Sequence, residues 1–202
     1  MSDTEALRAQ AASLGVALDP SQASRLIRFE ELLADRAIPQ GVVSASDATK
    51  IRERHILDSL RAAPVVEGAD LAADLGSGAG LPGVVVAISL PRLRMLLVER
   101  RPRRAALLEL AVEELRLPNA TVFAGPVAEM PGPVDVAFAR AFAPLDQAWA
   151  QARGVLRPGG RLVYFAGAAT TIPTAPEGAV ILDVLRTPVL ESSGALVIMT
   201  RQ

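Results

Sequence analysis

From residue 70 onward, short apolar runs alternate with segments of helical periodicity, and this alternation limits the folds that the chain can adopt. The apolar runs start at residues 70, 94, 120, 134 and 161 and read DLAADL, RMLLVE, ATVFAG, VDVAFA and RLVYFA. Short continuous apolar runs bounded by turn residues suit strands that are buried on both faces of a parallel sheet. Helical segments over residues 81–90, 103–117 and 144–155 lie between them. Alternating strands and helices predict a doubly wound α/β sheet.

The C-terminal segment departs from this alternation. AVILDVL and ALVIMT, at residues 179–185 and 195–200, are separated only by RTPVLESSG, which is too short to contain a crossover helix. We therefore expect these two strands to pair antiparallel. A parallel sheet that ends in an antiparallel hairpin is the Rossmann-like arrangement of class I S-adenosylmethionine (SAM)-dependent methyltransferases, which is the fold class that we predict.

The first 65 residues are predicted to form a helical extension that precedes a Rossmann-like domain over residues 66–202. Amphipathic helices are expected over residues 4–15 and 20–36, the second with Asp19 as its cap and Pro20 at its first position. A third helix is expected from Asp47 to about Ala62, ended by Pro64.

Composition excludes several kinds of chemistry. The chain has no cysteine and one histidine, which removes disulfides, thiolate metal sites and cysteine nucleophiles, and we expect no metal. Its net charge of −1 gives no global attraction to nucleic acid. The opening residues MSDTEALRAQAAS lack the apolar core of a signal peptide. No apolar run reaches the ~20 residues that span a membrane. We expect a soluble, cytoplasmic monomer without a membrane partner.

A glycine-rich loop follows the first predicted strand of the sheet. The strand ends in Asp74-Leu75, and Gly76-Ser77-Gly78-Ala79-Gly80-Leu81-Pro82-Gly83 comes directly after it. Glycines allow a sharp turn and let a ligand approach the backbone closely. Pro82 stands where the next helix should begin, and the positive end of that helix would face the ligand.

Two ligands compete for this loop. Residues 78–83 match the dinucleotide pattern G-x-G-x-x-G, which is a weak signal alone. Asp74, Gly76, Gly78 and Gly80 instead match an acid followed by G-x-G-x-G, as SAM sites tend to show, and the acid suits the ammonium of SAM. Glu99 ends the next strand, 25 residues after Asp74, where it could accept from both ribose hydroxyls of either cofactor. The acid-first pattern and the hairpin favour SAM.

Residues that the chain lacks limit which groups it could methylate. Methylation of carbon 5 of a pyrimidine needs a cysteine. An exocyclic amine usually goes with an Asn/Asp-Pro-Pro-Tyr/Phe turn, but residues 138–144 read FARAFAP. The common ribose 2′-hydroxyl tetrad needs two lysines, and Lys50 is the only one. A ring nitrogen such as nitrogen 7 of guanine needs only alignment with the methyl group. Arg140, at the end of the fourth strand, could bind a phosphate or a guanine edge, or form a salt bridge with Asp74 or Asp135.

The chain resembles the RsmG (GidB) family from about residue 20 to its end. Three segments carry the resemblance: Arg54-His55-Ile56-Leu57-Asp58-Ser59, Asp74–Gly83 and Arg140-Ala141-Phe142-Ala143. The family methylates guanine at ring nitrogen 7 in the 16S RNA of the small ribosomal subunit. The resemblance therefore implies the same reaction, with SAM as cofactor and with ribosomal RNA or the small ribosomal subunit as partner.

The resemblance also implies roles for single residues. The loop from Asp74 through Ser77 to Leu81 and Pro82, with Gly76, Gly78 and Gly80, would line SAM, and Glu99 would hold its ribose. Ala128 and Glu129 would flank the adenine, and Arg140 would contact the cofactor and border the site of methyl transfer. His55 and Asp58, three residues apart on one helix face, would close the pocket over the cofactor and, with Arg140, are the predicted catalytic residues. Alternatively, His55 is only a structural hydrogen-bonding residue.

Three other family signatures have no counterpart in this chain. Without gaps, Asn-Leu-Thr falls on Gly41-Val42-Val43, Leu-Lys-Gly falls on Phe165-Ala166-Gly167, and Arg-His falls on Gly194-Ala195. All three lie on the side expected to face the acceptor. A small-molecule acceptor, or a SAM-binding paralogue that has lost transfer, therefore stays open beside the RNA acceptor. Arg100, Arg101, Arg103 and Arg104 favour RNA, because local stability does not explain positive charge at the start of a helix. Alternatively, this run of charge is only a solvated face of that helix.

Overall fold

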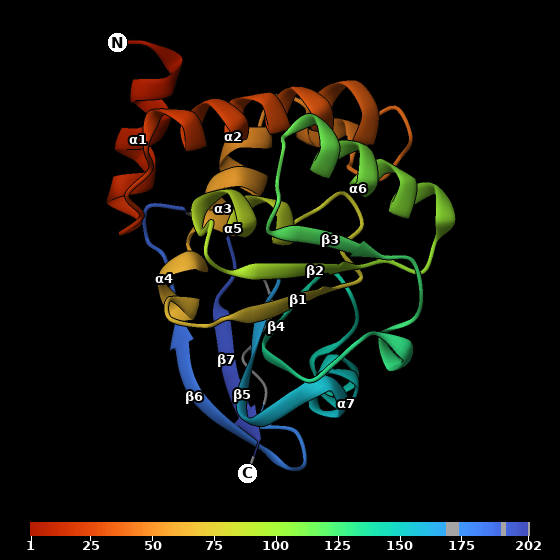
Figure 1. Cartoon of the computed structure of the whole chain (residues 1–202). Helices are drawn as coiled ribbons and strands as arrows, with labels where there is room; N and C mark the ends of the chain where they lie inside the picture. Colours follow the sequence, from red (N-terminus) through yellow and green to blue (C-terminus); the bar gives the residue numbers. More distant parts are fainter. Residues whose placement is uncertain (169–173, 191–192, 202) are drawn as a thin grey trace.

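The computed structural model describes residues 1–168, 174–190 and 193–201, and a seven-stranded sheet with the order β3-β2-β1-β4-β5-β7-β6 forms its centre (Figure 1). The strands are β1 Leu71–Leu75, β2 Arg94–Val98, β3 Ala120–Phe123, β4 Val134–Arg140, β5 Leu156–Phe165, β6 Ala179–Leu185 and β7 Leu196–Arg201. Strands β1 to β5 pair parallel, whereas β7 pairs antiparallel with both β5 and β6. The predicted fold class, with its C-terminal hairpin, is confirmed.

The strand order predicts where along the sheet a ligand would bind. The chain moves outward from β1 to β3 and then returns to add β4 on the other side of β1. In such sheets the ligand crevice lies at the carboxyl ends of the strands, where the order reverses. The residues that follow β1 and β2 and the last residue of β4 are therefore neighbours at one edge.

Both faces of the sheet are covered, and successive residues of each strand face opposite layers. Ala72 is in register with Met95 and Val136, and all three belong to a core cluster with the N-terminal helices. Ala73 and the residues in register with it belong to a second cluster, with the helix that contains Trp149. The helices are α1 Asp3–Ser13, α2 Pro20–Leu32, α3 Asp58–Leu60, α4 Ala63–Val66, α5 Gly83–Ser89, α6 Pro102–Glu114 and α7 Leu145–Val155.

The N-terminal helices match the expected positions except for the third. Asp19 caps α2, and the following turns continue as a π-helix, η1 Leu33–Ala37. In place of one helix from Asp47, the chain forms the 3₁₀ turn η2 Ala45–Asp47, the π-helix η3 Arg52–Leu57 and then α3. Pro64 does not end a helix, because it lies within the first turn of α4, where its missing N–H leaves no hydrogen bond unmade.

Two side-chain amides fix the end of α5, the helix that follows the glycine loop. Gln22 from α2 donates through Nε2 to the carbonyls of Ile88 and Ser89. Asn119, which precedes β3, donates through Nδ2 to three carbonyls within residues 87–93. These bonds satisfy carbonyls that a helix leaves unpaired at its C-terminus. They also hold the helical extension and the sheet against α5.

The helical extension and the sheet share one hydrophobic cluster, and the division at residues 65 and 66 stays a prediction. Within residues 1–168, 174–190 and 193–201, no helix is both long enough and apolar enough to cross a bilayer.

Candidate active site

The glycine loop closes around one buried carboxylate. Gly76, Gly78 and Gly80 have φ values of +67°, +60° and +93°, in the left-handed region that favours glycine. Oδ2 of Asp74 accepts hydrogen bonds from the hydroxyl of Ser77 at 2.7 Å and from the backbone N–H of Gly83 at 2.9 Å. Asp74 thus connects the start of the loop to the first residue of α5.

The environment of Asp74 disfavours its charged form. The residue is only 1% exposed, and burial raises the pKa of its carboxyl group to about 6, although the two hydrogen bonds act in the opposite direction. A carboxyl group that titrates near neutrality at the end of a strand is typical of a functional site.

Glu99, which follows β2, connects the loop to the next segment. Its Oε2 accepts from the backbone N–H of Gly78 at 3.1 Å, and its Oε1 accepts from that of Arg101 at 2.8 Å. A carboxylate has about four acceptor positions, so these two bonds leave part of its capacity unused. Glu99 is 4% exposed and lines a cavity.

That cavity, the first cavity below, measures about 430 Å³ and lies beside the glycine loop. It is lined by Gly76, Val98, Glu99, Arg100, Arg101, Arg104, Gly125, Pro126, Val127, Ala141, Phe142, Ala143, Gln147 and Gln151. Volumes of this order are typical of small-molecule sites. Its walls combine an acid, three arginines at or just before the start of α6, and apolar groups from β2 and from the segments that follow β3 and β4.

The structure brings only some of the predicted cofactor residues to this cavity. Gly76 and Glu99 line it, whereas Asp74, Ser77, Gly78, Gly80, Leu81 and Pro82 form the loop without being among the described lining residues. Ala128 and Glu129 are exposed in the 3₁₀ turn η4 Val127–Glu129, and Pro126 and Val127 line the cavity in their place. The roles of Ala128 and Glu129 beside an adenine stay predictions.

Phe142 also lines the first cavity, although the sequence named it only within a family segment and assigned it no role. A Cβ atom built on Gly76 would lie 2.5 Å from Cδ2 of the Phe142 ring, so the ring packs directly against this glycine. The aromatic residue two positions after the end of β4 is a signal that could have identified it, since loops at this edge face the ligand crevice.

A second cavity, of about 360 Å³, borders the first. It is lined by Arg54, Asp58, Arg140, Ala141, Tyr164, Phe165, Ala166, Gly167, Ala168, Ser193 and Gly194. Ala141 lines both cavities, and its φ of +49° is unusual for a residue other than glycine. Backbone outliers of this kind cluster at ligand sites. Ala141 separates Phe142 in the first cavity from Arg140 in the second.

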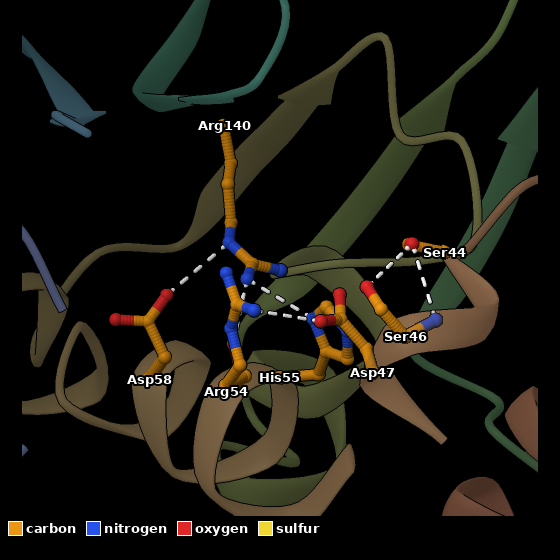
Figure 2. Close-up of polar contacts among 7 residues, drawn as sticks. All are labelled: Ser44, Ser46, Asp47, Arg54, His55, Asp58 and Arg140. Carbon is orange, nitrogen blue, oxygen red and sulfur yellow. Dashed lines mark hydrogen bonds and ion pairs between the residues drawn. The ribbon is translucent and has the colours of Figure 1, made fainter. Parts of the chain in front are cut away.

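A polar network from three elements surrounds Arg140 (Figure 2). The Arg140 guanidinium pairs through Nε with Asp58 at 3.2 Å, and its Nη2 donates to Nδ1 of His55 at 3.1 Å and to the carbonyl of Arg54 at 2.7 Å. Nε2 of His55 lies 3.2 Å from Oδ2 of Asp47. The structure thus brings together the three predicted catalytic residues, Arg140, His55 and Asp58, and adds Asp47.

The salt bridges expected for Arg140 are not the ones that form. Arg140 pairs with Asp58, while Asp135 pairs with Arg157 at 2.9 Å and accepts from the backbone at the start of β1. The reason is position, because Asp135 begins β4 and Arg140 ends it, at opposite edges of the sheet. Asp47 was predicted only as a helix start, and no motif in the sequence marks it as a neighbour of His55.

A second arginine, Arg61, contacts two residues that line the same cavity, Asp58 and Phe165. It is 6% exposed, donates to Oδ1 of Asp58 at 2.9 Å and stacks over the Phe165 ring, 5.5 Å from its centroid. Asp58 therefore lies between two guanidinium groups. Phe165 to Gly167, and Gly194, occupy the positions of two absent family signatures, and all of them line the second cavity.

Comparison with known proteins identifies relatives over most of the chain. The family model GidB, described as rRNA small subunit methyltransferase G, matches residues 22–178. Two curated relatives of that name come from Thermobifida fusca, 40% identical over 69% of this chain, and from Burkholderia pseudomallei, 37% identical over 87% of this chain. The matched regions cover 60% and 81% of those relatives, and 58% of a third relative from Rhizorhabdus wittichii that is 46% identical. The chain thus spans less than two thirds of the length of two of these three proteins.

Solved structures share the fold at low sequence identity. A mutant of MtNAS in complex with S-adenosylmethionine matches 98% of this chain and 77% of its own, with a TM-score of 0.62 and 17% identity. The mitomycin 7-O-methyltransferase MmcR matches 91% of this chain and 70% of its own, with a TM-score of 0.57 and 17% identity. At this identity the likeness establishes the fold alone. Within the described residues, no group of three or more His, Asp or Glu side chains has the arrangement of metal ligands.

Proposed function

The chain belongs to the GidB family, described as rRNA small subunit methyltransferase G, and we propose that it transfers a methyl group from S-adenosylmethionine to ring nitrogen 7 of a guanine in 16S ribosomal RNA. One observation carries this proposal beyond family membership. Two cavities, one beside the glycine loop and one beside Arg140, meet at Ala141. A transferase needs a donor and an acceptor site that touch at the reacting atoms.

The residues of the first cavity suit SAM. Its volume of about 430 Å³ lies in the range of small-molecule sites, and Glu99 has acceptor capacity left for two ribose hydroxyls. Phe142, Pro126 and Val127 offer apolar surface for a purine face. When bound, SAM supplies an electrophilic methyl group. Asp74 and the loop glycines would hold its aminoacyl end, where an ammonium favours the charged form of the buried carboxyl group.

The residues of the second cavity suit an acceptor that needs alignment rather than deprotonation. Nitrogen 7 of guanine has an in-plane lone pair, so no strong base is required. Within the described residues, the hydrogen bonds of Arg140 use Nη2 and Nε, which leaves Nη1 for a phosphate or for guanine O6. We infer that Arg140, fixed by Asp58 and His55, orients the acceptor.

An RNA acceptor is supported by positive charge at the rim of the first cavity. Arg100, Arg101 and Arg104 line it, although the whole chain has a net charge of −1. SAM carries no phosphate, so three guanidinium groups beside its site favour an additional anionic ligand, and phosphates are the anions of RNA. An acceptor in the ribosome would also place the protein in the cytoplasm.

Labelled methyl transfer tests the proposal. Small ribosomal subunits from a strain that lacks this gene should gain label from methyl-labelled SAM, and nucleoside analysis should place it in 7-methylguanosine of 16S RNA. Subunits from the parent strain are the control, because their site should already be methylated. Label in another nucleoside would contradict the assignment to nitrogen 7, and 7-methylguanosine at equal levels in the RNA of both strains would contradict the assignment to this chain.

A small-molecule acceptor is the second candidate. Small residues, namely Ala166, Gly167, Ala168 and Gly194, form much of the second cavity, in part where the family signatures carry Lys and Arg-His. Label that enters a metabolite extract but no ribosomal RNA would favour this candidate. SAM binding without transfer to either fraction would instead favour a paralogue that acts as a binding module.

A further inference from the structure

Acceptors on one short segment hold Arg140 at the second cavity. Its Nη2 donates to the carbonyl of Arg54 at 2.7 Å and to Nδ1 of His55 at 3.1 Å, and its Nε pairs with Asp58 at 3.2 Å (Figure 2). A guanidinium has hydrogen-bond donors only. His55 can therefore take part in this contact only as an acceptor, which means that Nδ1 carries no proton.

This requirement fixes the other ring nitrogen of His55. A neutral imidazole carries one proton, and here that proton must be on Nε2. Nε2 faces Oδ2 of Asp47 at 3.2 Å, and a carboxylate oxygen is an acceptor. Burial, and then the charge of Arg140, lower the pKa of His55, which keeps the ring neutral near neutral pH. The contacts of His55 with Asp47 and with Arg140 thus require the same tautomer, with the proton on Nε2.

Asp47 is held in place for this contact. It ends the 3₁₀ turn η2, is 7% exposed, and pairs through Oδ1 with Nη1 of Arg54 at 2.7 Å. Ser44 caps the turn by accepting from the backbone N–H of Ser46. An ion pair with Arg54 would be enough to balance the charge of Asp47. The second oxygen instead faces a neutral ring, which a purely structural ion pair does not require.

We propose that Asp47 is a positioning residue: it accepts the Nε2 proton of His55, leaves the Nδ1 lone pair facing Arg140, and so fixes the Arg140 guanidinium at the second cavity. The effect on methyl transfer rests on the proposed function. The tautomer of His55 does not rest on the proposed function, because it is a property of the chain alone. An experiment can therefore contradict the tautomer or the proposed function independently of the other.

The tautomer can be observed directly, because His55 is the only histidine in the chain. In the ¹⁵N-labelled full-length protein, ring correlation spectra distinguish a protonated nitrogen from an unprotonated one. We expect protonated Nε2 and unprotonated Nδ1 at neutral pH. In Asp47→Ala the preference should weaken toward the mixture of a free imidazole. Arg54→Ala removes the ion pair with Asp47 but leaves Oδ2 of Asp47 facing Nε2 of His55, and so should keep the preference. Protonated Nδ1 in the native protein would overturn the proposal without any variant.

A double-mutant cycle tests the consequence for transfer. In His55→Asn the side-chain oxygen lies near the place of Nδ1 and accepts from Arg140 without help from Asp47. Asp47→Ala alone should lower kcat roughly tenfold, the equivalent of one hydrogen bond, with the Kd for SAM nearly unchanged. In the His55→Asn background the same substitution should have little further effect. An equal loss of kcat in both backgrounds would mean that Asp47 acts independently of His55 and would refute the relay.

Discussion

At the residue scale, Asp74 accepts two hydrogen bonds, which favour its charged form, but it is also buried, which disfavours that form. Its carboxylate holds the loop through Ser77 and Gly83, yet burial raises its pKa to about 6 from 3.8. Between these two pH values the folded chain binds more protons than the unfolded chain. The stability that this group contributes is therefore fully present below about pH 3.8 and is lost as the pH rises through about 6. A bound cation would offset this loss, because it favours the charged carboxylate.

The pH dependence of SAM binding should therefore depend on Asp74. The ammonium of SAM favours the ionised carboxylate, so binding should lower the pKa of Asp74 and release a proton. We expect the affinity at pH 7 to be roughly tenfold higher than at pH 5, measured by calorimetry. Asp74→Asn leaves His55 in place and should bind more weakly with little of this slope. The same slope in both proteins would mean that Asp74 only holds the loop.

Gly83 should tolerate no side chain, for reasons of space rather than of backbone angle. A Cβ atom there would overlap Cδ2 of Leu97 and would lie 2.7 Å from Oδ2 of Asp74. We expect Gly83→Ala to lower the free energy of unfolding by about 1–3 kcal/mol and to weaken SAM binding. Gly154 lies near the end of α7, and a Cβ atom added there would meet no other atom within 4 Å. Gly154→Ala should stabilise the protein by about 0.4–1 kcal/mol. Urea unfolding that gives both changes the same sign would contradict this account.

At the element scale, the seven strands were predictable and the third helix was not. Strands β1, β2 and β4 are buried over most of their length, so their continuous apolar runs identify them. The segment from Asp47 has helical spacing, but its residues are set by tertiary contacts. Asp47 and Arg54 pair with each other, and Arg52 pairs with Glu30 on α2. These contacts favour a 3₁₀ turn and a π-helix over one regular helix. The helix propensities of the single residues do not account for such contacts, so the sequence did not predict this outcome.

The same distinction applies to the candidate site. Asp74, Glu99 and Arg140 each end or follow a strand at one edge of the sheet, so topology brings them together and the sequence predicts their proximity. Asp47 and Phe142 reach the site through loop conformation. The left-handed backbone of Ala141 directs the chain after β4, and no residue type in the sequence signals it, because alanine rarely adopts this conformation.

The end of α5 provides a test at this scale. Asn119 donates to the carbonyls of Ala87 and Leu93 at 3.0 and 2.9 Å, and aspartate has the same size but cannot donate. We expect Asn119→Asp to lower the free energy of unfolding by about 1–3 kcal/mol, because the carbonyls lose their partner and gain a negative neighbour. Gln10→Glu, the same change on the exposed face of α1, should cost less than about 0.5 kcal/mol. A similar small effect of both changes would show that the carbonyls are solvated.

At the scale of the whole molecule, the balance of charge has to be reconciled with an anionic partner. The chain has 21 basic and 22 acidic residues, so long-range attraction to RNA is absent on average. The distribution is uneven, however, because Arg100, Arg101 and Arg104 line the first cavity. Binding should then depend on a few local contacts, each of which releases counterions from the RNA.

The two ends of β2 allow this to be tested with matched variants. Arg100 and Arg101 follow the strand and line the first cavity, whereas Arg92 and Arg94 are exposed at its opposite end. Replacing Arg100 and Arg101 by alanine leaves the hydrogen bond from the Arg101 backbone to Glu99 possible, so the loop should keep its shape.

Each phosphate contact contributes about 0.7–0.9 to the slope of log affinity against log salt. Affinity for small ribosomal subunits should therefore fall, and the slope should decrease by about one to two. The same substitutions at Arg92 and Arg94 preserve the change in net charge but not its position, so they should leave the slope nearly unchanged. Equal losses in both variants would mean that total charge, rather than the rim of this cavity, governs the encounter with RNA.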